Sequence, residues 1–243
     1  MSTPLNACDD MCIDVLRRLI YIDRMSNSTP PTRLDLILDA ALPHAAFDGW
    51  SDDTLTRAAG DAGLSEDDVL LSAPRGALDL IAHWSARLDQ TMLDRLKSTD
   101  LKAMKIRERV TFAVQARLDA ISPHEEAALR ARARLLLHDA ATLGAELVWA
   151  TSDVIWTGMG DPSTDFNWYS KRATLSAVYA TSLAAWLNDR HPDKENARAF
   201  LDRRIQNVME FEKAKAGWRK MTTDLPDPAQ ILARLRYGRR RRA

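Results

Sequence analysis

Residues 153–172 read DVIWTGMGDPSTDFNWYSKR, and this stretch decides how the chain folds on either side of it. Two glycines and a proline interrupt helical periodicity, and Ser163 or Asp161 is placed to cap a following helix. The segment carries aromatic side chains where a solvated loop would carry polar ones. We therefore expect a turn that delivers Trp168 and Tyr169 onto the start of a helix.

Composition leaves the class of partner open. The chain has 243 residues, 46% of them hydrophobic, which is enough for one large or two small domains with a buried core. Lys plus Arg and Asp plus Glu both number 34, so net charge favours no partner. The sequence shows neither an apolar run of membrane-spanning length nor a secretory or Arg-rich transit pattern. Cys8 and Cys12 form neither a disulfide framework nor a tetrahedral metal site, which favours a reducing cytosol.

Helical periodicity dominates the chain. Apolar residues recur at spacings of three and four, and no alternating, β-branched stretch predicts a strand. The sequence therefore predicts an all-α protein with about nine helices. We expect them at residues 9–25, 32–48, 52–62, from 65, at 77–96, 102–121, 123–150, 166–189 and 196–215.

Three short helices in residues 32–80 have the layout of a helix-turn-helix unit, and its charge decides whether it reads DNA. Between Thr32 and Asp79 there are three basic residues against ten acidic ones, and the segment in the recognition position, from Ser65, reads SEDDVLL. Affinity for DNA comes largely from Lys and Arg neutralising phosphates. We therefore expect no nucleic-acid partner.

Catalytic motifs are missing from the sequence. The five histidines form none of the spacings of a metal site, and no nucleophile elbow, phosphate loop or dinucleotide fingerprint occurs. Asp161 and Asp165 form an i, i+4 pair of acids, which at a helix start is more often capping than catalysis. We expect no catalytic residues, no metal and no cofactor.

The segment GDPSTDFNWYSKRA, residues 160–173, followed by Leu175, Tyr179 and Thr181, resembles a known family. It is similar to the accessory lipid-binding proteins of ubiquinone (coenzyme Q) biosynthesis, whose fold is like that of TetR-type transcriptional regulators. A looser likeness runs from about Arg33 to about Lys215 and includes RGALDL at residues 75–80. The resemblance implies a TetR-like helical bundle.

The resemblance also implies a buried isoprenoid-like lipid between the later helices. The expected ligand is an isoprenoid quinone precursor or a phospholipid. Apolar residues on adjoining predicted helices would line such a site, although periodicity alone favours ordinary core. The candidates are Leu143, Leu147, Val148, Val154, Leu175, Val178 and Tyr179.

A second site follows from the same segment. Aromatic anchors beside a carboxylate and a guanidinium are typical of interface hot spots, and core packing is the alternative. The resemblance implies that this patch docks the ubiquinone-pathway hydroxylase, although Ser170 stands where the family more often has threonine. The candidates are Ile155, Trp156, Asp165, Trp168, Tyr169 and Arg172.

The C-terminal tail combines apolar and cationic residues. Such a short amphipathic helix suits an anionic membrane surface, while a basic tail that is disordered or touches RNA is the alternative. The membrane candidates are Ile231, Leu232, Leu235, Arg234, Arg236, Arg239 and Arg240.

Together these features predict four segments. They are an N-terminal amphipathic helix and linker (1–31), the helix-turn-helix-like module (32–80), a lipid-binding and dimerisation bundle (81–220) and the basic tail (221–243). We expect a non-catalytic accessory protein that presents a quinone precursor to the hydroxylase. We expect a homodimer formed by the last two long helices. We also expect a cytoplasmic protein that is peripherally associated with a bacterial inner membrane. A ligand-responsive transcriptional regulator and an enzyme acting on a quinone or lipid are the alternatives.

Overall fold

The computed structural model describes residues 30–223, and within this range every regular element is helical. The predicted all-α fold is confirmed for this part of the chain. Its α-helices are α2 (Arg33–Asp48), α3 (Asp52–Asp61), α4 (Glu66–Ser72), α5 (Ala77–Lys97), α6 (Ile106–Asp119), α7 (Glu125–Leu135), α8 (Ala141–Gly158), α9 (Asp165–Asn188) and α10 (Glu195–Thr223). Two short 3₁₀ helices, η1 (Leu101–Ala103) and η2 (Ser122–His124), lie between them.

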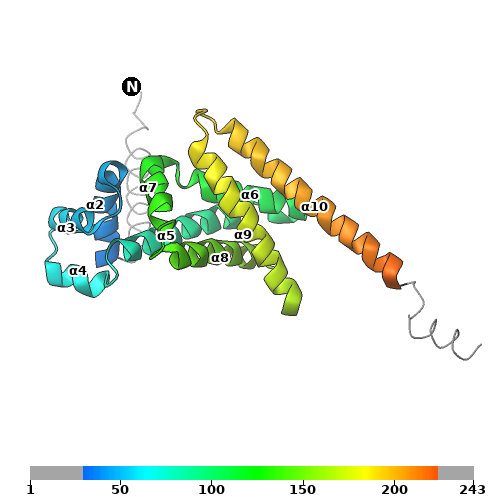
Figure 1. Ribbon diagram of the computed structural model, residues 1–243, viewed down its shortest axis with the longest axis horizontal. Coiled ribbons are helices and arrows are strands. Elements are labelled where there is room, and N and C mark those ends of the chain that lie inside the picture. The colour runs from blue at the N-terminus through cyan, green and yellow to red at the C-terminus, as the bar shows by residue number, and fades with distance from the viewer. Residues whose placement is uncertain (1–29, 224–243) are drawn as a thin grey trace, which may run out of the picture.

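Capping residues fix the three short N-terminal helices where the sequence predicts them. Thr32 and Asp35 form a capping box at the start of α2, and Ser65 and Asp68 form another at the start of α4. Gly49 ends α2 with a φ of 83°, a conformation that other residues rarely adopt. These caps hold α2, α3 and α4 in one small unit at the end of the molecule (Figure 1).

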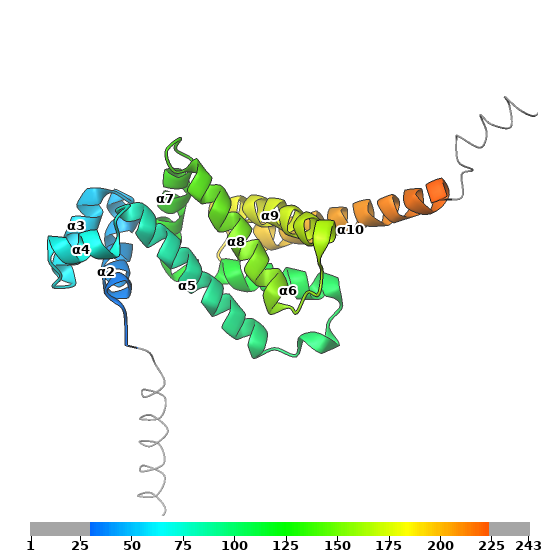
Figure 2. The same cartoon turned by 90° about the horizontal axis from the view of Figure 1, so that it is seen from below.

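The remaining helices form a bundle beside this unit. α8 packs against α5 on one side and α9 on the other, and the first half of α10 packs on α9 (Figures 1 and 2). Their contact faces bury Leu80, Met92, Ile155 and Leu201 completely or nearly so. α10 then projects beyond the bundle in both views. No helix within residues 30–223 combines the length and apolar character needed to cross a bilayer.

The single helix expected at residues 123–150 is wrong, because the chain turns back between α7 and α8. An ion pair stabilises this turn, because Arg134 donates to Asp139 at 2.7 and 3.0 Å. Gly144 allows the two helices to approach, since a Cβ there would lie 3.2 Å from the carbonyl oxygen of Leu135. No glycine or proline marks the turn, so tertiary packing of α8 on α5 and α9 outweighs local helix propensity.

Three smaller differences concern helix ends. α6 begins at Ile106 rather than at residue 102, because Asp100 caps the short helix η1 at the backbone of Lys102. The residue at the N-cap of α9 is Thr164, while Ser163 donates instead to Asp161 at 2.7 Å. α10 continues to Thr223, beyond both its expected end and the predicted segment boundary at residue 220.

Candidate functional site

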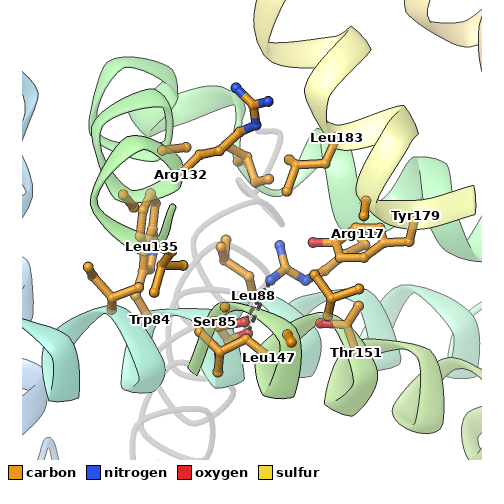
Figure 3. Close-up of a pocket in the computed structure, with 18 of the residues that line it drawn as sticks. Trp84, Ser85, Leu88, Arg117, Arg132, Leu135, Leu147, Thr151, Tyr179 and Leu183 are labelled. Atoms are coloured by element: carbon orange, nitrogen blue, oxygen red, sulfur yellow. Dashed lines mark hydrogen bonds between the residues drawn. The ribbon is translucent and has the colours of Figure 1, made fainter. Parts of the chain in front are cut away.

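A cavity of about 460 Å³ lies between α5, α6, α7, α8 and α9 (Figure 3). This volume falls within the range of roughly 300–1,000 Å³ that small-molecule pockets occupy. Most of its lining is apolar. The lining residues are Ile81, Trp84, Ser85, Leu88, Arg117, Ile121, Ala128, Ala131, Arg132, Leu135, Leu136, Ala141, Gly144, Ala145, Leu147, Val148, Thr151, Tyr179, Ala180 and Leu183.

Small side chains on three facing helices create this space. α7 contributes Ala128 and Ala131, α8 contributes Gly144 and Ala145, and α9 contributes Ala180. Large side chains at such positions would interdigitate and fill the interior to the density usual in proteins. The alanines therefore leave room for a molecule the size of a lipid segment, while Gly144 lets α8 approach Leu135 of α7 at the edge of that space.

The inner end of the cavity is polar. Arg117 from α6 donates through Nε to Asp89 Oδ1 at 2.5 Å and through Nη2 to Ser85 Oγ at 3.1 Å. Thr151 donates to the same carboxylate at 3.0 Å, and the Arg117 guanidinium lies 5.8 Å from the centre of the Tyr179 ring. Figure 3 shows this guanidinium between Ser85 and Tyr179. The apolar cavity therefore ends on a buried, hydrogen-bonded ion pair.

One donor of this ion pair is unused. Arg117 Nη1 is buried and has no hydrogen-bond partner within the described part of the chain. Burial raises the pKa of Asp89 above its ordinary value, although Arg117 and Thr151 oppose the shift. Burial likewise raises the pKa of the Tyr179 phenol. The polar end thus offers a spare N–H and a neutral hydroxyl.

The opposite end of the cavity is exposed at the turn between α7 and α8. Leu136 lines the cavity and is 68% exposed, and the adjacent Leu137 is 55% exposed. Arg132 also lines this end, and Figure 3 shows its guanidinium directed away from Arg117. We call this end the mouth of the cavity.

Of the seven residues predicted to bind lipid, Leu147, Val148 and Tyr179 line the cavity. Leu175 and Val178 are instead buried in the helical core, while Leu143 and Val154 are only partly buried and lie outside the lining. Helical periodicity identifies a buried face but does not separate the residues that fill a core from those that border a space. The lipid-binding role of all seven stays a prediction.

Sequence reasoning missed the half of the lining that α5, α6 and α7 contribute. Trp84, Leu88, Arg117 and Leu135 all border the cavity. One signal was available in the sequence, namely the alanines at 127, 128 and 131 on the inner face of α7. An inner helix face without large side chains indicates unfilled space.

A second feature, which we call the aromatic surface, consists of Trp149, Trp168 and Tyr169. The ring centres of Trp168 and Tyr169 lie 4.7 Å apart in an edge-on arrangement, and Trp149 lies 6.1 Å from Trp168. Tyr169 is 60% exposed. Rigid, partly exposed aromatic rings are the side chains that most often anchor protein interfaces.

Arg172 holds the aromatic surface from behind. Its guanidinium lies 3.9 Å from the centre of the Trp168 ring and donates through Nε to Asp153 Oδ1 at 2.5 Å. Only 2% of Arg172 is exposed. This residue was predicted to contact a partner, but the structure places it as a buried support for Trp168.

Lys171 and Asp161 fix the turn that precedes the aromatic surface. Lys171 donates to Asp161 Oδ1 at 2.7 Å, and its ammonium lies 5.0 Å from the centre of the Trp156 ring. Burial alone would raise the pKa of Asp161, but hydrogen bonds from Lys171 and Ser163 lower it below its ordinary value. Asp161 is therefore an ionised structural carboxylate that accepts from Lys171 and Ser163, and it does not cap α9, whose N-cap is Thr164.

The other predicted contact residues lie in different environments. Ile155 is 0% exposed and packs in the core, and Trp156 is partly buried, with its indole donating to the Lys171 carbonyl at 3.3 Å. The Asp165 side chain lies outside the described residues, as do the membrane candidates of the tail and the segment 1–29. Within residues 30–223, no group of His, Cys, Asp and Glu side chains is arranged to hold a metal ion.

Comparison with known proteins shows which family these features resemble. Residues 141–212, which span α8, α9 and half of α10, match the COQ9 family model. The chain is 33% identical over 180 residues to the ubiquinone biosynthesis protein COQ9, mitochondrial, of Rattus norvegicus, and 32% identical over 180 residues to that of Homo sapiens. Each match covers 71% of this chain, which spans 57% of the rat protein and 56% of the human protein.

Among solved structures, a TetR transcriptional regulator from Nitrosomonas europaea shares the fold. Its TM-score is 0.59 with 22% sequence identity, over 71% of this chain and 95% of the regulator. The predicted TetR-like architecture is confirmed.

The expected location is wrong. We predicted a cytoplasmic protein at a bacterial inner membrane, whereas the matching proteins of rat, human and cattle are named as mitochondrial. That prediction used two free cysteines as evidence for the cytosol. Cysteine content reports only whether a compartment is reducing, and so it does not separate the cytosol from other reducing compartments.

The predicted resemblance is confirmed: the chain carries the COQ9 family domain at residues 141–212 and is similar to COQ9 ubiquinone biosynthesis proteins over 71% of its length.

Proposed function

We propose that this protein is a non-catalytic accessory protein of ubiquinone biosynthesis that binds an isoprenoid quinone precursor and presents it to the pathway hydroxylase at a mitochondrial membrane. The observation that carries the proposal is the apolar cavity of about 460 Å³ in a chain similar to ubiquinone biosynthesis proteins. Burying apolar ligand surface there contributes roughly 25 cal/mol per Å². A polyisoprenoid molecule is nearly insoluble in water, so this gain favours a carrier.

The size of the cavity limits how much of the ligand it holds. A group the size of a water molecule or a methylene takes up roughly 30 Å³, so about 460 Å³ accommodates on the order of fifteen such groups. A long polyisoprenoid chain has several times as many carbon atoms. The remainder of the chain then leaves through the mouth beside the exposed Leu136 and Leu137.

The aromatic surface supports the proposed docking of the hydroxylase. Tyr169 offers an exposed ring, and Trp168 is held rigid by Arg172, so little conformational freedom is lost on binding. Self-association through α9 and α10 is part of the same proposal, and the exposed Phe211 on α10 supplies an apolar contact for it. The tail beyond residue 223 supplies the proposed membrane contact.

Charge argues against the regulator alternative. The first turn of α4, which occupies the recognition position, carries Glu66, Asp67 and Asp68. These acids would face the phosphates of a docked duplex and repel them. The enzyme alternative would have to use the buried Asp89, Arg117 and Tyr179 at the inner end of the cavity, and it is decided by experiment.

Native mass spectrometry of the purified protein, followed by extraction and identification of the bound molecule, tests the proposal. We expect an apolar isoprenoid ligand to be retained, and added short-chain quinone precursor to bind without being converted. A protein that retains no apolar molecule and takes up none on addition is not a lipid carrier. Accumulation of a modified precursor in the absence of the hydroxylase would show instead that the protein is an enzyme.

A further inference from the structure

Arg117 Nη1 is an unpaired donor at the inner end of an otherwise apolar cavity. Its neighbours Nε and Nη2 are engaged by Asp89 and Ser85, but Nη1 has no hydrogen-bond partner within residues 30–223. A buried N–H of a charged group that lacks an acceptor destabilises the protein. A ligand atom that accepts from Nη1 relieves this penalty, so the structure favours a ligand with an acceptor at this end.

We propose that Arg117 orients the ligand by donating from Nη1 to an oxygen of an uncharged ring head group, with the apolar chain directed toward the mouth. This inference rests on the proposed function and specifies how the ligand lies in the cavity. It also distinguishes between the two ligand classes that the sequence left open, because a ring oxygen and a phosphate differ in charge.

The charge of the inner end favours a neutral head group. Asp89 neutralises Arg117 at 2.5 Å, and Thr151 donates to the same carboxylate. A phosphate placed here would add an unbalanced negative charge to a buried site, which is strongly unfavourable. A carbonyl or hydroxyl oxygen accepts one hydrogen bond and adds no charge. Among the described lining residues, the cation other than Arg117 is Arg132 at the mouth, and a phospholipid phosphate would meet it there.

The inner end is also the end closer to the aromatic surface. On α8, Thr151 lies between Trp149 of the aromatic surface and Asp153, which supports that surface through Arg172. On α9, Tyr179 follows Arg172 by seven residues, roughly 10 Å along the helix axis. If Arg117 orients the ligand in this way, about the thickness of one helix separates the ligand ring from the aromatic surface, where the hydroxylase is proposed to dock.

Two variants test the role of Arg117 in ligand binding while keeping the fold intact. Arg117→Lys keeps a cation beside Asp89 but removes the planar fork that carries Nη1. The double variant Asp89→Leu/Arg117→Met replaces the ion pair by apolar side chains of similar size, an exchange that buried pairs often tolerate. Circular dichroism and thermal melting establish that each variant is folded.

The probes are a ubiquinone with two isoprene units, a hydrocarbon with the same chain but no ring, and phosphatidylglycerol. For the wild-type protein we expect the quinone to bind tenfold or more tightly than the hydrocarbon, the effect of one hydrogen bond to a charged donor. In both variants we expect this preference to fall to within threefold, with hydrocarbon binding unchanged.

The possible outcomes separate this inference from the proposed function. A quinone preference that survives in both folded variants overturns the role of Arg117 while leaving the cavity as a lipid site. A loss of phosphatidylglycerol binding equal to the loss of quinone binding overturns the preference for an uncharged head group. If the wild-type protein binds none of the three probes, the proposed function itself is rejected.

Discussion

Filling the cavity with a side chain tests whether the cavity is where the ligand binds. Ala131 on α7 is buried and lines the cavity, so Ala131→Phe directs a phenyl ring into it. Six added carbon atoms take up at most about 180 Å³ at roughly 30 Å³ each, which is well under the cavity volume of about 460 Å³. The ring therefore fits without forcing the helices apart, and we expect the ligand-free protein to keep its melting temperature.

The ligand then loses space. By the same volume, the ring takes the space of up to about six methylene-sized groups. If the bound ligand loses half of these, about three, binding weakens by about 2.4 kcal/mol at ~0.8 kcal/mol per buried methylene. This corresponds to a dissociation constant about fiftyfold higher. Displacement of a bound fluorescent fatty acid by a short-chain quinone measures the change.

Ala133→Phe is the matched control, because Ala133 lies on the same helix but is exposed and does not line the cavity. Both variants carry the same helix-propensity cost, so any difference between them reports the location of the side chain. We expect Ala133→Phe to bind the quinone as the wild-type protein does. If Ala131→Phe is folded and its affinity changes by less than threefold, the ligand does not occupy this cavity.

Three further predictions concern the aromatic surface, the arginine that supports it and the first helix cap. Tyr169→Ala should weaken hydroxylase binding by about 2 kcal/mol, roughly thirtyfold, with little change in stability because the ring is 60% exposed. Arg172→Met should instead destabilise the fold by about 3 kcal/mol, because it removes the buried cation that pairs with Asp153 and leaves Asp161 with Lys171 alone. Equal effects of the two variants on melting would contradict this assignment. The hydrogen bond from Thr32, with a smaller effect of His83, lowers the pKa of Asp35 from 3.8 to about 2. The contribution of the Asp35 carboxylate to stability is therefore complete above pH 3.8 and is lost as the pH falls through 2. Urea unfolding measures the free energy of unfolding of the wild-type protein and of Asp35→Asn between pH 6 and 2. Over this range the wild-type protein should lose up to about 2 kcal/mol more than the variant. If the two proteins lose stability in parallel as the pH falls, the role of this carboxylate is refuted.

The sequence predicts the helices well where local chemistry determines their ends. Thr32, Ser51 and Ser65 cap α2, α3 and α4, because each side chain accepts a hydrogen bond from a backbone N–H in the first turn of its helix. The expected starts of these helices lie within one residue of the observed ones. The break between α7 and α8 has no such local signal. It depends on the packing of α8 against α5 and α9, which lie far away along the chain.

The candidate sites show the same division. Aromatic residues in a helix-breaking segment point to the aromatic surface, and the structure brings Trp168 and Tyr169 together there. The burial of Arg172 and the inner position of Arg117 were not predictable, because each depends on an acid from another helix, Asp153 and Asp89 respectively. Periodicity places these arginines on helices but gives no information on which partner their charges meet.

The helix-turn-helix unit has an acidic recognition segment, and it also makes structural contacts with two helices that border the cavity. Trp50, which lies between α2 and α3, stacks on Trp84 of α5 with ring centres 5.6 Å apart and donates its indole N–H to the carbonyl of Ala127 at 2.9 Å. Trp84 lines the cavity, and Ala127 precedes the cavity alanine Ala128 on α7. The unit therefore holds two walls of the cavity in place. Removing the unit would leave Trp84 and α7 without these contacts, so we expect the shape of the cavity to depend on it.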